Sequence, residues 1–238
     1  MTQTMSEQTT IQVNFSRPVP LFPLDTVALL PQQIQPLHVF EPRYSQMVGR
    51  ALDGAGQIAM AIFKGDRWKQ EYHGNPPLRR AVCIGQIIQH EMISGHRYNI
   101  VVQGVCRARI VEEYMPDEDR QYREAMLEPI GVEQEGEELP EVRRRLGELL
   151  GEGPLTQLAA AGWIAERVRN DQIPTSALLE LVSFTVLSDR ELRYRLLDEG
   201  DAEARAALIE CELTHLQALL KRAAAQHPED WPKGMSWN

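Results

Sequence analysis

The sequence lacks the features that would place the chain in a membrane or outside the cell. No apolar run in its 238 residues is long enough to span a bilayer. Residues 1–16 are rich in Thr, Gln and Ser, without the basic start or apolar centre of a secretory signal, so we expect a flexible tail. The only cysteines are Cys83, Cys106 and Cys211, and an odd number at distant positions fits a reducing compartment. We therefore expect a cytoplasmic protein.

Positive charge is also scarce. The chain has 25 Lys and Arg residues against 34 Asp and Glu residues, which gives a net charge of −9. A general binder of nucleic acid or of an anionic membrane needs a basic face. The composition therefore argues against both classes of partner.

Catalytic and metal-binding motifs are missing as well. No G-x-x-x-x-G-K-[ST] phosphate loop and no Ser-x-x-Lys spacing occur. His90-Glu91 begins like a zinc-protease helix but lacks the second histidine and falls on an expected strand. The six histidines have no ligand spacing, and we interpret His38 as a structural residue of a strand. We expect no enzyme, no metal and no cofactor.

The most informative segment is Val19–Tyr44, which contains five prolines among apolar residues. Proline fixes φ and lacks a backbone donor, so each one ends a strand, lies on an edge or shapes a turn. We expect strands over 21–30 and 33–40, a helix over 42–52 that ends at Asp53-Gly54, and a buried strand over 58–64. Short strands between proline corners favour a small irregular barrel.

A long hairpin is expected over residues 81–111. Ser94-Gly95 has the composition of a two-residue turn. With that turn, Cys83 lies opposite Cys106, and we expect two reduced thiols there; a bulge at Gly85 or Gly104 would break this register. The alternation also sends Arg107 and Arg109 outward, where they form a small basic strip with Arg97.

The character of the chain changes near residue 132. An acidic segment over 133–138 precedes helices that begin near Pro140, Pro154 and Pro174. Ser188 and Glu191 have capping-box spacing, and Asp201 is placed to cap a last helix that ends near residue 225. The fold class is therefore α+β, with a β-barrel half followed by a helical bundle. We expect a tail over 1–16, a barrel over 17–131, a bundle over 132–227 and a mobile tail over 228–238.

Three motifs resemble a known family. They are Pro-Leu-Phe-Pro at 20–23, Phe-Glu-Pro-Arg-Tyr at 40–44, and the hairpin segments 84–87, 95–100 and 104–110. Their order is similar to that of the Lon protease N-terminal (substrate-binding) domain family, which implies a PUA-like β-barrel followed by a helical bundle. Three departures are visible: Gln86 stands for the usual Thr, Ala108 for the usual Phe, and Pro31-Gln32 for the usual Pro-Gly. The last of these predicts a turn of different shape.

The resemblance implies a non-catalytic binding module, a member of the family without the ATPase and protease domains that follow in full-length Lon. Its expected partners are unfolded or apolar polypeptide segments, or a protein partner. The candidate contact residues are Leu29, Leu30 and Ile34, with Glu41 and Arg43 as a charged pair that we interpret mainly as a helix cap. Leu29, Leu30 and Ile34 equally suit the barrel interior. The alternatives are an RNA-binding PUA-like protein and a hydrolase with an unrecognised site.

Overall fold

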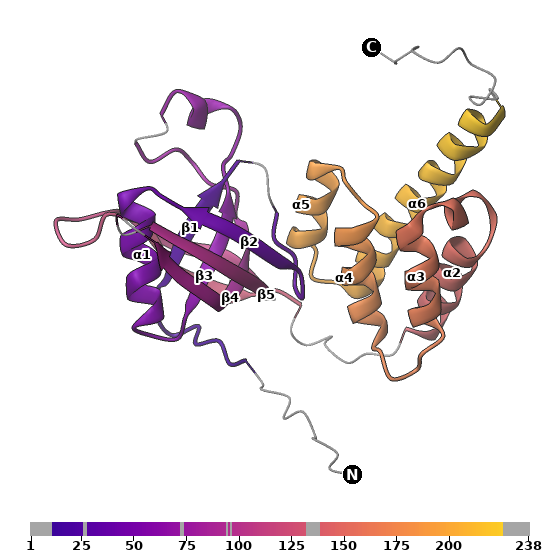
Figure 1. Cartoon of the computed structure of the whole chain (residues 1–238), viewed down its shortest axis with the longest axis horizontal. Coiled ribbons are helices and arrows are strands. Elements are labelled where there is room, and N and C mark those ends of the chain that lie inside the picture. The colour runs from indigo at the N-terminus through magenta and orange to yellow at the C-terminus, as the bar shows by residue number, and fades with distance from the viewer. Residues whose placement is uncertain are drawn as a thin grey trace, which may run out of the picture. The chain divides into compact units, whose positions relative to one another are not determined.

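The chain forms two compact units in the computed structural model, 1–130 and 131–238. The structure describes residues 11–25, 28–71, 74–93, 95, 97–131 and 139–225. The acidic segment over 133–138 and the C-terminal tail over 228–238 lie outside these ranges. Each unit is described by itself below (Figure 1).

The first unit is a six-stranded sheet that closes on itself. Its strands are β1 (Val19–Leu24), β2 (Ile34–Val39), β3 (Gln57–Ile62), β4 (Ala81–Ile93), β5 (Arg97–Tyr114) and β6 (Glu124–Pro129). The order is β2-β5-β4-β3-β1-β6, and β5 also pairs with β6, so five strands form a closed ring. β1 runs parallel to β3, and the other pairings are antiparallel. β2 pairs with the first part of β5 as the outer strand. The expected barrel half is confirmed.

The local sequence explains where these elements begin and end. β1 ends at Leu24, so Leu29 and Leu30 lie in the following loop and not in a strand. Helix α1 (Pro42–Leu52) starts with Pro42 in its first turn, where the missing N–H has no helical partner to lose, and ends at Asp53 as predicted. Figure 1 shows α1 beside the barrel, where it contacts β1, β3 and β5. A short 3-10 helix, η1 (Arg67–Lys69), lies in the connection between β3 and β4.

The predicted register of the long hairpin is wrong over most of its length. Ile93 pairs with Arg97, so three residues and not two connect β4 and β5. The register also shifts at two places in β4, between Ile87 and Gln89 and between Ile84 and Gly85. As a result Cys83 lies opposite Arg107, and Cys106 lies opposite Ile84. None of the three cysteines, all of which lie in the described ranges, forms a disulfide.

The N-terminal segment differs in part from the expected flexible tail. Residues 1–10 lie outside the described ranges, but Val13 and Phe15 pack against the barrel core. They contact a cluster of buried side chains contributed by β1, β3, β4, β5 and β6. The prediction failed because two apolar residues among polar ones carry no clear periodic signal.

The second unit is a helical bundle. Its elements are α2 (Pro140–Gly151), η3 (Gly153–Gln157), α3 (Ala159–Val168), α4 (Thr175–Thr185), α5 (Arg190–Asp198) and α6 (Ala202–Ala225). Leu146, Leu150, Ile164 and Leu178 are among the fully buried residues of its core. No helix in the described ranges is long and apolar enough to cross a membrane. The α+β class is confirmed.

Two helix starts correct details of the prediction. Pro154 begins the short 3-10 segment η3, and the α-helix after it starts only at Ala159. The cap of α5 is Asp189 and not Ser188: Asp189 Oδ1 accepts a hydrogen bond of 2.7 Å from the Leu192 N–H. The cap by Asp201 is confirmed, because its Oδ1 accepts a bond of 2.7 Å from the Ala204 N–H.

Candidate functional site

β2 is an edge strand with one side of its backbone turned away from the barrel. Gln33 accepts a hydrogen bond of 2.8 Å from the Gly104 N–H, so its backbone faces β5. Backbone direction alternates along an antiparallel strand, so the backbone groups of Ile34, Pro36 and His38 face away from β5. Pro36, which has no N–H, therefore occupies a position where no ladder bond to β5 is lost. This edge is available to a further strand.

A shallow groove of about 880 Å³ runs over β2 and the adjoining parts of β4 and β5. Its lining residues come from three short stretches: Pro36, Leu37 and His38 on β2; Ile88, Gln89, His90 and Glu91 on β4; and Asn99, Ile100 and Val101 on β5. The register aligns them in rows across the strands. In one row, His38 is opposite Asn99, which is opposite Glu91.

Large apolar side chains are exposed around this groove. Ile34 is 58% exposed, Phe40 63%, Ile88 42% and Met92 61%. Phe40 stacks on His38 with ring centroids 6.0 Å apart, and His38 Nδ1 is hydrogen bonded to Asn99 Oδ1 at 2.8 Å. Water contact with such side chains is unfavourable, and an apolar partner would remove it. We call the surface formed by the groove together with Ile34 and Phe40 the β2 groove.

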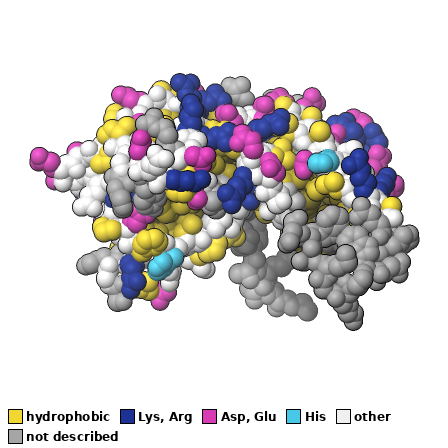
Figure 2. Space-filling model, turned by 90° about the horizontal axis from the view of Figure 1, so that it is seen from above, with side chains coloured by type: hydrophobic (Ala, Val, Ile, Leu, Met, Phe, Trp, Pro, Cys, Tyr) yellow, Lys and Arg dark blue, Asp and Glu magenta, His cyan; other side chains and the backbone are white. Residues whose placement is uncertain are grey.

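The electrostatics of the β2 groove suit a neutral or weakly basic ligand. Glu91 is the single Asp, Glu, Lys or Arg among the ten described residues that line the groove. Figure 2 shows Lys and Arg side chains interspersed with Asp and Glu over the visible face, without a continuous region of one sign. The expected basic strip is wrong, because Arg107 is only 6% exposed and its side chain lies inside the unit. The RNA-binding alternative, which was suggested by the PUA-like barrel, is not favoured, because the buried Arg107 gives it no support.

The structure separates the predicted contact residues into two groups. Leu29 and Leu30 have no exposed surface, so they fill the barrel and do not offer a contact to a ligand in this conformation. Ile34 is exposed at the start of the edge strand. Glu41 and Arg43 form an ion pair with each other, with Arg43 Nη2 2.9 Å from Glu41 Oε2. The interpretation of Glu41 as a side-chain cap is wrong: Glu41 is at the N-cap position of α1, but its side chain makes no capping bond to the helix.

The sequence also predicted that His90 and Glu91 lie on a strand and do not form a metal site. His90 and Glu91 lie on β4, as the strand prediction required. Within the described ranges, no group of three His, Cys, Asp or Glu side chains is arranged to hold a metal ion.

Sequence reasoning missed most of the residues around the β2 groove. Ile88 falls where the β4–β5 register shifts, and the exposure of Phe40 depends on which strand forms the edge. The position of Pro36 within an apolar run was the available signal, because proline in a strand indicates an edge.

The fold is a closed β unit followed by a helical bundle, and the β unit has a groove with exposed apolar side chains beside the edge strand β2. A comparison of the sequence with curated proteins finds no match. A sequence profile of the ATP-dependent protease La (LON) substrate-binding domain matches residues 18–215. The chain belongs to this family, and its role is that of a substrate-binding module.

Solved structures show the same fold. The N-terminal domain of the Mycobacterium avium complex Lon protease is similar with a TM-score of 0.61 at 17% identity, and the match covers 83% of this chain and 98% of that one. The Lon N-terminal domain protein from Xanthomonas campestris is similar with a TM-score of 0.58, also at 17% identity, covering 83% of this chain and 98% of that one. The expected family resemblance is confirmed.

Proposed function

We propose that this protein binds extended, apolar polypeptide segments along the β2 groove. The observation that carries the proposal is a groove over β2, β5 and β4 with Ile34, Phe40 and Ile88 exposed around it, beside an edge strand whose outer side pairs with no strand of the described residues. An extended peptide beside β2 can make only a few main-chain hydrogen bonds, because Pro36 has no N–H, so most of its affinity comes from contacts with these apolar side chains. The family's substrate-binding role supports this assignment.

The charge of the groove narrows the expected ligand. Glu91 favours a segment that carries a basic residue near His38, at the end of β2, whereas a segment with an acidic residue at that point meets like charge. The rest of the lining has no Asp, Glu, Lys or Arg, and its polar side chains, His38, Gln89, His90 and Asn99, can fix the register of a peptide.

The proposal is tested with the double substitution Ile34→Asp and Ile88→Asp. Both side chains are exposed, so we expect the fold to be retained while binding of an unfolded reporter, such as reduced and carboxymethylated lactalbumin, falls at least about 10-fold, roughly 1.4 kcal/mol. Binding is measured by fluorescence anisotropy.

Val111→Asp is the matched control. Val111 is 62% exposed on β5 and is not part of the groove lining. Unchanged binding by the double variant, or an equal loss in the control, would show that the reporter is bound elsewhere.

A further inference from the structure

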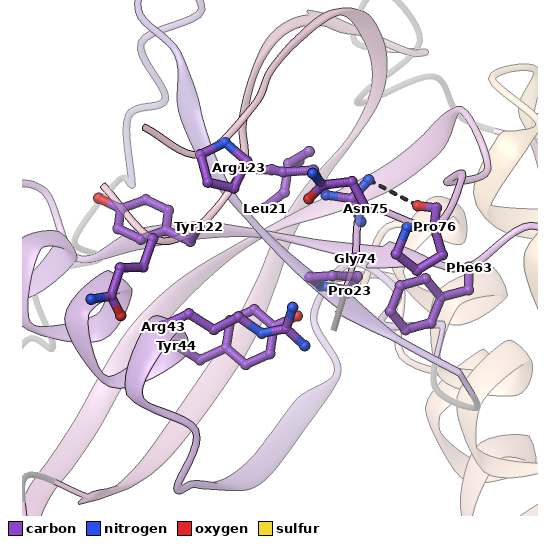
Figure 3. A pocket seen from close by; sticks show the side chains of 12 residues that line it. Leu21, Pro23, Arg43, Tyr44, Phe63, Gly74, Asn75, Pro76, Tyr122 and Arg123 are labelled. Atoms are coloured by element: carbon purple, nitrogen blue, oxygen red, sulfur yellow. Dashed lines mark hydrogen bonds between the residues drawn. The ribbon is translucent and has the colours of Figure 1, made fainter. Parts of the chain in front are cut away.

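A second concave site lies in the barrel unit, between β1, α1 and the segment that leads into β6. It is a cavity of about 20 Å³, and its lining includes Arg43, Tyr44, Asn75, Tyr122 and Arg123. Figure 3 shows Arg43 and Tyr44 on one side of this cavity and Arg123 with Asn75 on the opposite side. We call it the arginine pocket. It shares no lining residue with the β2 groove.

Arg123 is a buried cation with donor capacity that the fold does not use. The residue is 6% exposed, and its Nη1 donates 2.9 Å to the Pro76 carbonyl oxygen and 3.3 Å to Glu113 Oε2. A guanidinium has five N–H donors. Both hydrogen bonds from Arg123 to described residues use Nη1, so Nε and Nη2 can donate to a ligand.

The electrostatics of Arg123 also leave room for another anion. Burial lowers the pKa of Arg123, the Glu113 carboxylate opposes that shift, and the charge of Arg43 adds to the lowering. A buried charge is stabilised only by close partners with good geometry. Glu41 is already paired with Arg43, whereas the contact between Arg123 and Glu113 is long at 3.3 Å. A further carboxylate would therefore act mainly on Arg123 and would offset its repulsion from Arg43.

The size and lining of the cavity select the kind of anion. About 20 Å³ is the room of about one water molecule, so only the small anionic end of a ligand enters, and the planar carboxylate needs less space than the tetrahedral phosphate. Pro23, Phe63 and Pro116 also line the pocket, so the group attached to the carboxylate meets apolar side chains.

We propose that the arginine pocket binds a carboxylate attached to an apolar group, held between Arg43 and Arg123. The same chemistry is found at the C-terminus of a polypeptide and in a free small carboxylate. Bidentate contact with a guanidinium is the geometry that such a ligand favours. The proposal does not depend on peptide binding in the β2 groove.

The experiment compares an N-terminally labelled apolar hexapeptide that has a free C-terminal carboxylate with the same peptide amidated. We expect the free carboxylate to bind at least about 10-fold more tightly in fluorescence anisotropy, because hydrogen bonds to charged groups are the stronger class. Arg43→Gln and Arg123→Lys should each reduce this preference to less than about 3-fold, since the change removes a charge or the planar fork.

Lys69→Gln is the control, because it removes one positive charge from an exposed side chain of the same unit. It should leave the preference unchanged. Arg43 has a side-chain exposure of 22%, so Arg43→Gln provides a folded variant if Arg123→Lys fails to fold. Circular dichroism verifies the fold of each variant.

Competition identifies the source of the carboxylate. Displacement by N-acetyl-leucine alone supports a pocket for small carboxylates, and displacement only by longer free-acid peptides supports recognition of a polypeptide C-terminus. Equal binding of acid and amide, or an undiminished preference in folded Arg43→Gln, would overturn the proposal. The groove variant Ile34→Asp with Ile88→Asp should retain the acid preference, so failure of one site is distinguishable from failure of the other.

Discussion

Replacement of Gly104 by Ala should both destabilise the barrel and weaken the binding of a reporter in the β2 groove. Gly104 is buried in β5, where its N–H donates to the Gln33 carbonyl and its own carbonyl accepts from the Gln32 N–H, both at 2.8 Å. A Cβ at this position would lie less than 3.0 Å from the carbonyl carbon and oxygen of Leu30, and 3.2 Å from Cys83 Sγ. The loop before β2 must therefore move.

The magnitude follows from two contributions. Overpacking of a tight interior costs about 1–3 kcal/mol. Displacement of the loop weakens two backbone hydrogen bonds, each worth about 0.5–1.5 kcal/mol. Alanine in place of glycine returns about 0.5–1 kcal/mol through the smaller entropy of the unfolded chain. We expect a net loss of about 1–5 kcal/mol in the free energy of unfolding of the barrel.

The assay needs a signal that reports on the barrel alone. Trp68 stacks on Phe63 with centroids 5.6 Å apart, so a background with the other three tryptophans changed to phenylalanine reports on this unit in urea. Gly49→Ala is the control, because its Cβ would lie 3.6 Å from Tyr98 Oη in ordinary contact, and it should stabilise α1 by about 0.5–1 kcal/mol. A Gly104→Ala variant within about 0.5 kcal/mol of the unsubstituted protein, with full reporter binding, would refute the reasoning.

Four further changes test single features of the fold. Gln32 has φ of 64°, so Gln32→Gly should stabilise the barrel by about 0.5 kcal/mol in the Trp68 background, and a loss would show that the Gln32 side chain contributes more than the backbone strain. Leu146→Ala should lower the unfolding free energy of the bundle by about 2–5 kcal/mol, followed through Trp163 fluorescence, because Leu146 is fully buried. Asp189→Ala should cost about 0.5–2 kcal/mol in thermal unfolding, whereas an equal effect of Ser188→Ala would contradict the observed cap. Burial raises the pKa of Tyr122 above its ordinary value of 10.0. The stability that the neutral phenol contributes is therefore fully present below pH 10 and is lost as the pH rises through the folded-state pKa. In urea titrations at alkaline pH, Tyr122→Phe should lose less stability than the unsubstituted protein.

The helix boundaries were predictable because single residues determine them. Pro42 and Pro140 begin helices, and Asp53 and Asp201 end or cap them through local geometry that the sequence carries by itself. Pro31-Gln32 was expected to form a turn of different shape. Gln32 instead has a positive φ, the conformation that glycine adopts most easily, and its N–H is bonded to Gly104. The close approach of Gly104 to Leu30 requires that turn, and the tertiary contact prevails over the local preference.

The binding surfaces were less predictable because they depend on register and on distant pairing. Register shifts in β4 and β5 change which side chains share a face, and no local signal marks the shift beside Ile87. Arg107 shows the consequence: alternation sent it outward, but the shifted strand places it inside the unit. Arg43 and Arg123 lie far apart in sequence and line one cavity only because α1 and β6 both pack beside β1.

The exposed β2 edge raises the question of how this strand can bind the proposed peptide without promoting indiscriminate pairing. Only Ile34 and His38 direct an N–H outward, because Pro36 between them has none, and the Gln35 side chain donates to the Pro36 carbonyl at 3.1 Å. A partner strand therefore finds few backbone bonds on this edge, and proline is a common protection of edges against aggregation. Affinity must then come mainly from the apolar side chains beside the edge. For the proposed peptide binding, this arrangement predicts weak affinity and fast release, with tolerance of many apolar sequences.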